Sequence, residues 1–412
     1  MGAENQVQKQ LSSIILTALE GCATSLNKWR RDFIFETLML FLSIHGRVNF
    51  LQLARNSKYG EQRFRQQFEK PFDFLKFNSK LVEENLTGRK VIAIDPSYIP
   101  KSGKKTPHIS RFWSGCAAAV KRGVEVLGIA AVDIDSREAV HLEAVQTQPD
   151  AKNSNEEDMT LIEWYLSKLK ERAVELLKIS STIVCDAYFA KEPFVAPLIE
   201  IGFNVVSRLA KNASLRYIHQ ENPDTPRGKG RPRQWDGKID LKNLDLDRFA
   251  AFEYAANTCF ATVAYSVALK RNILIIVEQL PHESKTIQRV IFSTDTTASP
   301  EKVLDTYHAR FQIEFLFRDA KQSVALNHCQ ARSENKLHSH INFSLMALNI
   351  ARIAHYQNAT KHQTPFSIAD VKLQMHNYLM LSIFIRKFGI NPNLKKNHII
   401  FKELILYGSK AA

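Results

Sequence analysis

The chain has 412 residues, which is enough for two or three domains of ordinary size. With 45% hydrophobic and 24% charged residues, 15 glycines and 14 prolines, its composition excludes collagen-like and broadly disordered chains. Lys and Arg number 56 against 42 Asp and Glu, and the resulting net charge of +14 favours a polyanionic partner, either nucleic acid or an anionic membrane.

Membrane association and secretion are not expected from the sequence. The longest apolar stretch, residues 33–44, is interrupted by Glu36 and is too short to span a bilayer. The first residues, Met-Gly-Ala-Glu-Asn, lack the basic and apolar regions of a signal peptide. Five scattered cysteines without CxxC spacing argue against a disulfide framework or a zinc module. These features predict a cytoplasmic protein that binds nucleic acid.

Residues 1–88 are predicted to form a helical N-terminal region that binds DNA. A turn at 46–50 separates a short helix at 51–55 from a second helix at about 60–69, which carries Arg63 and Arg65. Two short helices around a tight turn, the second of them basic, are typical of a helix-turn-helix that reads DNA. The alternative is a plain helical bundle with a solvated, charged face.

Residues 89–210 are predicted to form the first part of an α/β core. Three strands, a helix, a strand, a helix and a strand follow one another, which is the order of a ribonuclease-H-like fold with a mixed sheet. The strands are expected at 91–94, 124–133, 139–147, 182–185 and 203–209, and the helices at 154–179, opened by a capping box of Ser154 and Glu157, and at 192–201.

The second half of the chain divides into three predicted regions. Residues 211–298 form an inserted β-rich subdomain, residues 299–358 complete the core, and residues 359–412 form a C-terminal helical region. Within them we expect strands at 238–241, 249–254, 262–269, 273–278 and 286–292, helices at 300–321, 334–356 and 368–385, and a short tail after Pro392.

Asp95 and Asp186 each follow a short apolar run that reads as a buried strand. Neighbouring strands of one sheet bring their ends close together, and two adjacent carboxylates persist only with hydrogen bonds or divalent cations between them. An aspartate at the end of a strand can instead be a simple turn former. The pair therefore predicts either a metal site or two turns.

The predicted helix at 300–321 carries Tyr307, Arg310, Glu314 and Lys321. At ~100° per residue, these four side chains project from one face within an arc of ~60°. The alternative is a solvated ladder in which Arg310 pairs with Glu314. Bulky apolar residues occupy most of the remaining circumference, which argues against a freely solvated helix: Phe311, Ile313, Phe315, Leu316 and Phe317.

The spacing Tyr307-x2-Arg310-x3-Glu314-x6-Lys321, downstream of the two aspartates, resembles the Tyr-Arg-Glu-Lys signature of insertion-sequence-four-type DDE transposases. The resemblance covers roughly residues 91–352. It implies that Asp95, Asp186 and Glu314 form a catalytic triad that holds two Mg²⁺ ions, with Mn²⁺ as a substitute. It also implies that Tyr307, Arg310 and Lys321 hold phosphates of the transposon end.

The activity that this resemblance implies is that of a Mg²⁺-dependent endonuclease and strand transferase. Two divalent ions held by carboxylates stabilise the attacking and leaving oxygens when a phosphodiester is cut. The enzyme would cut double-stranded DNA at terminal inverted repeats and join those ends to target DNA. It would act as a homodimer, with residues 334–406 as the expected contact region, in the cytoplasm of a bacterium and close to the nucleoid.

Further basic residues are candidates for DNA contacts. The segment 226–233 carries four cations with Gly and Pro between them, and resembles Gly-Arg-Pro elements that enter minor grooves; the alternative is a solvated loop. Arg208 ends the strand after Asp186, where the resembling enzymes also have a DNA-contacting arginine, and Lys211 follows. The candidates from these two segments are Arg208, Lys211, Arg227, Lys229, Arg231 and Arg233, and the group Lys101, Lys104 and Lys105 is a further possibility.

Two other functions compete with cleavage and strand transfer. The first is a DNA-binding remnant or repressor that binds transposon ends without cutting them. The second is a tyrosine recombinase with Tyr307 as the nucleophile, which would need an arginine–histidine cluster that the sequence does not suggest.

Overall fold

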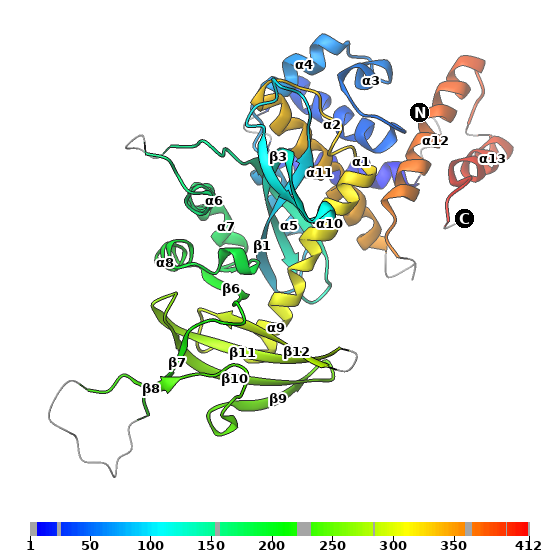
Figure 1. Cartoon of the computed structure of the whole chain (residues 1–412). Helices are drawn as coiled ribbons and strands as arrows, with labels where there is room; N and C mark the ends of the chain where they lie inside the picture. The colour runs from blue at the N-terminus through cyan, green and yellow to red at the C-terminus, as the bar shows by residue number, and fades with distance from the viewer. Residues whose placement is uncertain are drawn as a thin grey trace.

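The computed structural model describes residues 6–22, 26–152, 157–220, 232–282, 285–358, 365–392 and 394–410. The protein is a mixed α/β fold with a 12-stranded sheet and helices at both ends of the chain (Figure 1). The first strands have the connectivity of a ribonuclease-H-like core, so the predicted fold class is confirmed. None of the described helices is long and apolar enough to cross a membrane.

The N-terminal region is helical, as predicted. Its helices are α1 (Gln6–Glu20), α2 (Lys28–Ser43), α3 (Phe50–Arg55), α4 (Glu61–Glu69) and α5 (Phe74–Asn85). Asparagine side chains begin two of them, because Asn27 and Asn49 accept hydrogen bonds from the backbone three residues later. The predicted pair of short helices around a turn therefore exists as α3 and α4, and its role in binding DNA stays a prediction.

The core sheet begins with four antiparallel strands, and the long third strand pairs with each of the other three. The four are β1 (Lys90–Pro100), β2 (Ser110–Ser114), β3 (Ala119–Asp133) and β4 (Ala139–Gln146). Next to them, β5 (Thr182–Val184) and β6 (Asn204–Arg208) run parallel to β1, giving the order β2-β3-β1-β5-β6. We predicted that the first strand would end at Asp95, which is wrong. Because β3 has 15 residues and keeps pairing with β1, the strand continues through Pro96 to Pro100.

Three helices connect these strands: α6 (Leu161–Lys170), α7 (Ala173–Ile179) and α8 (Glu192–Ile201). The helix that we expected from Ser154 begins instead at Leu161. Ser154 lies outside the described residues, and the capping box is formed by Thr160 and Glu163, each side chain bonding the other's backbone. The sequence contains the Ser/Thr-x-x-Glu pattern at both places, and pattern alone does not choose between them.

The β-rich stretch extends the core sheet. Its strands are β7 (Leu215–Ile218), β8 (Trp235–Lys238), β9 (Ala250–Tyr254), β10 (Asn257–Ser266), β11 (Arg271–His282) and β12 (Lys285–Ser293). β12 pairs antiparallel with β6, with Ile291 opposite Arg208, so hydrogen bonding is continuous from the core into these strands. The boundaries proposed for the regions of the chain remain predictions.

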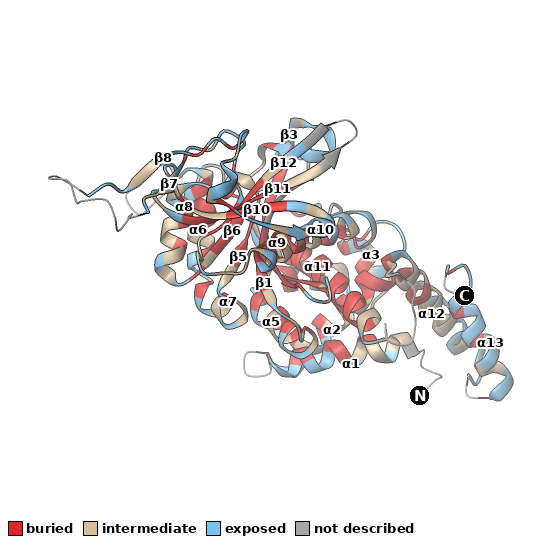
Figure 2. Cartoon of the chain, turned by 90° about the horizontal axis from the view of Figure 1, so that it is seen from below, coloured by how far each residue is buried: buried red, intermediate tan, exposed pale blue. Residues whose placement is uncertain are grey.

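The remaining helices are α9 (Pro300–Ala309), α10 (Phe311–Ser323), α11 (Glu334–Asn358), α12 (Ile368–Phe388) and α13 (Lys395–Leu406). The sequence predicted only a tail where α13 lies. Figure 2 shows that α11 is largely buried at the centre of the helical part, that α12 is mostly of intermediate burial, and that α13 is largely exposed.

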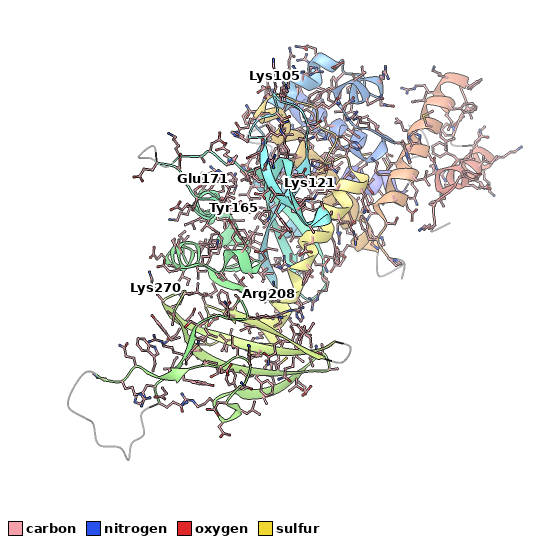
Figure 3. All side chains as sticks on the ribbon, viewed as in Figure 1. Lys105, Lys121, Tyr165, Glu171, Arg208 and Lys270 are labelled. Carbon is pink, nitrogen blue, oxygen red and sulfur yellow. The ribbon has the colours of Figure 1, made fainter. Side chains whose placement is uncertain are left out.

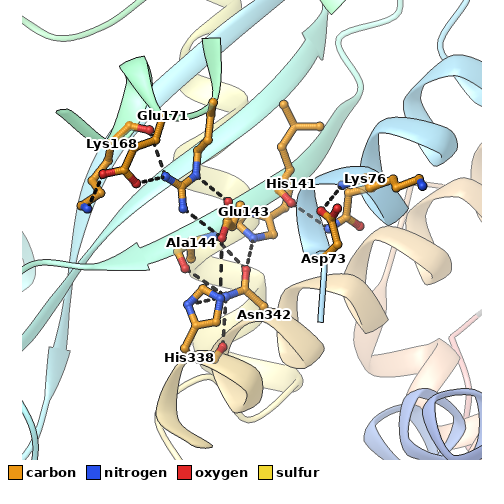
Figure 4. Close-up of polar contacts among 12 residues, drawn as sticks. Asp73, Lys76, His141, Glu143, Ala144, Lys168, Glu171, His338 and Asn342 are labelled. Carbon is orange, nitrogen blue, oxygen red and sulfur yellow. Dashed lines mark hydrogen bonds and ion pairs between the residues drawn. The ribbon is translucent and has the colours of Figure 1, made fainter. Parts of the chain in front are cut away.

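Asparagine side chains of α11 cover the free edge of the sheet at β4. Asn342 accepts a hydrogen bond from the backbone nitrogen of Ala144 and donates one to its carbonyl oxygen, at 2.8 and 2.9 Å (Figure 4). Asn349 does the same at His141. These side chains replace a missing strand partner, which satisfies the buried backbone groups and fixes α11 against the core.

Candidate active site

Asp95 and Asp186 lie at the same level of two adjacent parallel strands. Ala93 of β1 is in register with Val184 of β5, and continuing this register by two residues sets the two aspartates opposite each other. Neighbouring strands are about 4.8 Å apart, so both carboxylates belong to one small region of the sheet. Asp186 begins a short 3-10 turn, in which its Oδ1 accepts a hydrogen bond of 2.9 Å from the backbone nitrogen of Tyr188.

The third acidic residue is brought to this region by α10. We predicted one unbroken helix over 300–321, but the structure has two, with α9 ending at Ala309 and α10 beginning at Phe311. Arg310 at the junction keeps helical dihedral angles, so the two helices follow one another with little change of course. Arg310 and Glu314 consequently remain one turn apart on the same face, as the spacing predicted.

Arg310 joins two of the three acidic residues. Its Nη2 donates a hydrogen bond to Glu314 Oε1 at 2.7 Å, and its Nη1 lies 3.5 Å from Asp95 Oδ1. The arginine side chain is only 7% exposed, whereas the Glu314 side chain is 43% exposed. The side chains from β1 and α10 therefore converge, with the charge of the buried guanidinium between two carboxylates.

The Asp95 carboxyl group has an unusual proton affinity. Its pKa is raised to about 7, chiefly by burial; the positive charges of Arg310 and Lys321 oppose this rise, and the negative charges of Glu314 and Asp186 add to it. The three carboxylates thus act on one another, and Arg310 and Lys321 offset part of the effect of burial.

These residues fit divalent metal ions by their chemistry. Asp95, Asp186 and Glu314 supply hard carboxylate oxygens, the ligands that Mg²⁺ prefers, and the raised pKa of Asp95 reflects its burial beside two other carboxylates. Within the described part of the chain, no group of three or more His, Cys, Asp or Glu side chains is already arranged to hold an ion. The guanidinium of Arg310 contacts two of the oxygens that would serve as ligands.

Lys321 and Tyr307 flank this cluster. Lys321 Nζ donates a hydrogen bond of 2.9 Å to Ser97 Oγ on β1, and burial lowers the pKa of the lysine. Tyr307 is only 3% exposed, so its ring belongs to the packed interior. Below the helix, the ring of Phe317 fills the space over Gly128, the β3 residue opposite Asp95 in the sheet.

The other predicted DNA-contacting residues are spread over the surface. Arg208, labelled in Figure 3, is exposed at the end of β6, and Lys211 is exposed just beyond it. Arg233 donates a hydrogen bond to the carbonyl oxygen of Trp235. On α4, Arg63 stacks on Trp29 and Arg65 pairs with Glu61. The predictions for Arg227, Lys229 and Arg231 fall outside the described residues.

Two residues near the site were not predicted from the sequence. Ser97 holds Lys321, and its position two residues after Asp95, on the same face of a strand, was an available signal. Ser207 donates a hydrogen bond to the backbone carbonyl of Asp186 at 2.7 Å. That contact depends on the pairing of β5 with β6, and no local sequence pattern indicates it.

The comparison with known families agrees with this arrangement. The family model described as Transposase DDE domain matches residues 87–350, which run from just before β1 into α11. The chain belongs to this family. No curated protein sequence matches it. Membership establishes a transposase, a protein of DNA transposition and recombination, and the matched span includes Asp95, Asp186 and Glu314.

Proposed function

We propose that this transposase cuts double-stranded DNA at the terminal inverted repeats of a bacterial insertion sequence and transfers the cut strands into target DNA. In this proposal Asp95, Asp186 and Glu314 are the catalytic carboxylates, and they hold two Mg²⁺ ions, for which Mn²⁺ can substitute. The insertion-sequence-four-type character rests on the spacing of Tyr307, Arg310, Glu314 and Lys321, a finer statement than the family match carries.

The observation that carries the proposal is the convergence of β1 and α10 at Arg310. Arg310 donates a hydrogen bond to Glu314 and lies 3.5 Å from Asp95. It thereby brings together two acidic residues that are far apart in the chain, at positions 95 and 314. A salt-bridge ladder along one helix would not involve a residue of the sheet. The contact with Asp95 therefore favours a functional cluster over the solvated ladder.

The side chains have separate roles in this chemistry. Bound divalent ions would activate the attacking water or 3′-hydroxyl and stabilise the leaving oxygen. Arg310 and Lys321 supply positive charge for the non-bridging oxygens of the phosphate, and Ser97 orients Lys321 through its hydrogen bond. Tyr307 is buried in this conformation, and in this proposal it holds a phosphate of the transposon end together with Arg310 and Lys321.

Several basic residues extend the proposed DNA-binding surface away from the carboxylates. Charges of this kind neutralise backbone phosphates and position the duplex without reading its sequence. The proposed set comprises Arg63, Arg65, Arg208, Lys211 and Arg233, together with Arg227, Lys229 and Arg231 of the segment outside the described residues.

We further propose that the end-bound enzyme is a homodimer that acts in the bacterial cytoplasm, near the nucleoid. Paired cleavage requires two copies that each hold one transposon end. An apolar stripe on α12 supports a contact between copies, because Met380, Phe384 and Phe388 recur every four residues and are 52%, 49% and 70% exposed.

Cleavage of the flanking DNA tests the proposal. The full chain would be incubated with duplexes carrying the two sequences that border its reading frame, with Mg²⁺, Mn²⁺ or a chelator. We expect metal-dependent cleavage by the wild type and none by Glu314→Gln or Asp95→Asn. Glu301→Gln, which neutralises an exposed acid on α9, is the matched control and should cleave normally. Tight binding by the wild type without any cleavage would instead support a catalytically silent remnant or repressor.

A further inference from the structure

A strongly basic cleft lies away from the three carboxylates. It has a volume of about 1150 Å³ and is formed by three stretches that are distant in sequence: the N-terminal helices, the loop after β1, and the segment that leads into α11. None of the described residues that line it is acidic. Its cations are Arg47, Arg65, Lys101, Lys104, Lys105, Arg332 and Lys336.

Within the described ranges, acidic side chains pair with two of these seven cations. Arg65 pairs with Glu61 at 2.6 Å, and Lys336 pairs with Glu69 at 2.8 Å. Lys101 has a structural task, since its Nζ donates hydrogen bonds to the backbone carbonyls of Asn327 and Cys329, at 3.0 and 2.5 Å. These bonds tie the loop after β1 to the segment before α11 and fix the shape of the cleft.

Four cations remain without compensation. The side chains of Arg47, Lys104, Lys105 and Arg332 form no hydrogen bond or ion pair with any residue in the described ranges, and all four are exposed. Like charges gathered around one cleft repel each other, so the arrangement is unfavourable until an anion enters. Several charges spread over a large cleft fit a polyanion better than a single small ion.

The lining indicates which polyanion fits. No aromatic side chain is present, so unpaired bases or a free nucleotide would find no stacking platform. The lining is mostly charged or polar, unlike the apolar pockets that hold small molecules. The phosphate backbone of a duplex presents repeated negative charge without requiring contact with bases, and it matches this lining.

The position of the cleft relates it to the proposed catalytic site. Strand β1 continues from Asp95 to its last residue, Pro100, and Lys101 follows at the edge of the cleft. Six residues of extended chain span about 20 Å. The rise of a DNA duplex is about 3.4 Å per base pair, so this separation corresponds to about six base pairs. The hydrogen bond between Lys321 and Ser97 lies on the same strand between the two places.

We propose that this cleft binds the backbone of the same DNA duplex that is cut beside Asp95, at phosphates about six base pairs from the scissile bond. The inference rests on the proposed function and adds to it a second anchoring point. A duplex held at both places is fixed in register along β1, and α4 contributes to the cleft through Arg65. The N-terminal helices thereby help to position the DNA that is cut at the carboxylates.

A charge-matched pair of variants tests the cleft. Lys104→Gln/Lys105→Gln/Arg332→Gln removes three exposed, unpaired cations, whereas Lys170→Gln/Lys178→Gln/Lys270→Gln removes three exposed cations elsewhere. Figure 3 labels Lys105 and Lys270 in well-separated parts of the molecule. Binding of the full chain to a 40-base-pair duplex with one flanking end would be measured against salt concentration. Three lost phosphate contacts should lower the salt slope by about 3 and weaken binding about a hundredfold at 0.1 M salt.

Phosphate ethylation of the same duplex locates the contact. We expect interference about four to eight base pairs from the cut in the wild type and in the control variant, and none there in the cleft variant. An unchanged slope in the cleft variant, an equal loss in the control, or interference only beside the cut would overturn the inference. Metal-dependent cleavage that Glu314→Gln abolishes is scored separately, so failure of the cleft can be distinguished from failure of the proposed function.

Discussion

Arg310 donates a hydrogen bond of 2.7 Å to Glu314 across one helical turn, and the same guanidinium lies 3.5 Å from Asp95. Among the described residues, this arginine is the basic side chain that forms ion pairs with both carboxylates. Its buried position makes that role difficult to replace, since water cannot compensate the charges fully.

Arg310→Gln should therefore make the fold depend on divalent ions. Losing the cation leaves two facing carboxylates, and we expect a cost of about 1–3 kcal/mol in chelator, less than for a fully buried pair because Glu314 is partly exposed. Mg²⁺ should recover more stability in this variant than in the wild type. Urea unfolding with and without Mg²⁺ measures the effect.

Arg318→Gln, which removes an exposed arginine of α10, is the control. Equal destabilisation with and without Mg²⁺ would contradict the role of the arginine as a counter-charge.

The raised pKa of Asp95 predicts how the metal-free protein responds to pH. The pKa rises from 3.8 to about 7 on folding, so the folded state binds more protons than the unfolded state between these values. The contribution of Asp95 to stability therefore falls as pH rises through this window and levels off above about 7. The difference in urea midpoint between wild type and Asp95→Asn, measured in chelator from pH 4 to 8, isolates this group from the other titrating residues.

The same pKa links metal binding to proton release. Mg²⁺ requires the ionised carboxylate, so at pH 6 its binding should release a proton from Asp95, and its affinity should rise up to about pH 7. Calorimetric titration in two buffers of different ionisation enthalpy counts the proton. Proton release that persists unchanged in Asp95→Asn would show that another group is responsible.

A substitution at Gly128 tests whether the position of α10 over the sheet matters for cleavage. A β-carbon at this position would lie 2.4 Å from Phe317 Cζ, and the facing residue in the sheet is Asp95. Gly128→Ala should displace the helix, cost about 1–3 kcal/mol and reduce cleavage. Gly115→Ala meets no atom within 4 Å and should be neutral. Gly128→Ala combined with Phe317→Leu should recover part of both losses. Full cleavage by the single variant would mean that the helix position is not critical.

The strands and the helical spacing of the site were largely predictable from the sequence. The apolar runs before Asp95 and Asp186 marked two adjacent strands, and the helical spacing placed Arg310 and Glu314 on one face, where the structure shows them in contact. The local patterns are strong there because each of these contacts arises within one helix or from neighbouring buried strands. Helix α13 was missed because its sequence follows Pro392, which was interpreted as the start of a tail.

Contacts between distant segments could not be predicted in the same way. The continuation of β1 beyond Asp95 depends on pairing with β3, and the pairing of β12 with β6 joins the β-rich stretch to the core sheet. The basic cleft brings together Arg47, Lys105 and Arg332, which no local pattern connects. The burial of Tyr307 could not be predicted either, because helical spacing gives a face and not the neighbours that cover it; its contact with DNA stays a prediction.

The apolar stripe on α12 provides a test of the proposed homodimer. The rings of Phe384 and Phe388 lie 4.5 Å apart, and both are exposed, so a second copy could cover them together. Phe384→Ser/Phe388→Ser should leave the fold intact because neither side chain is buried, and it should prevent two ends from being held in one complex. Sedimentation of the end-bound protein should then give one chain and one duplex, where the wild type gives two of each.

Val174→Ser, at an isolated exposed apolar residue of α7, should sediment like the wild type. A double variant that still forms the paired complex would exclude this stripe as the dimer contact, and a wild type with one chain per end would exclude the dimer itself.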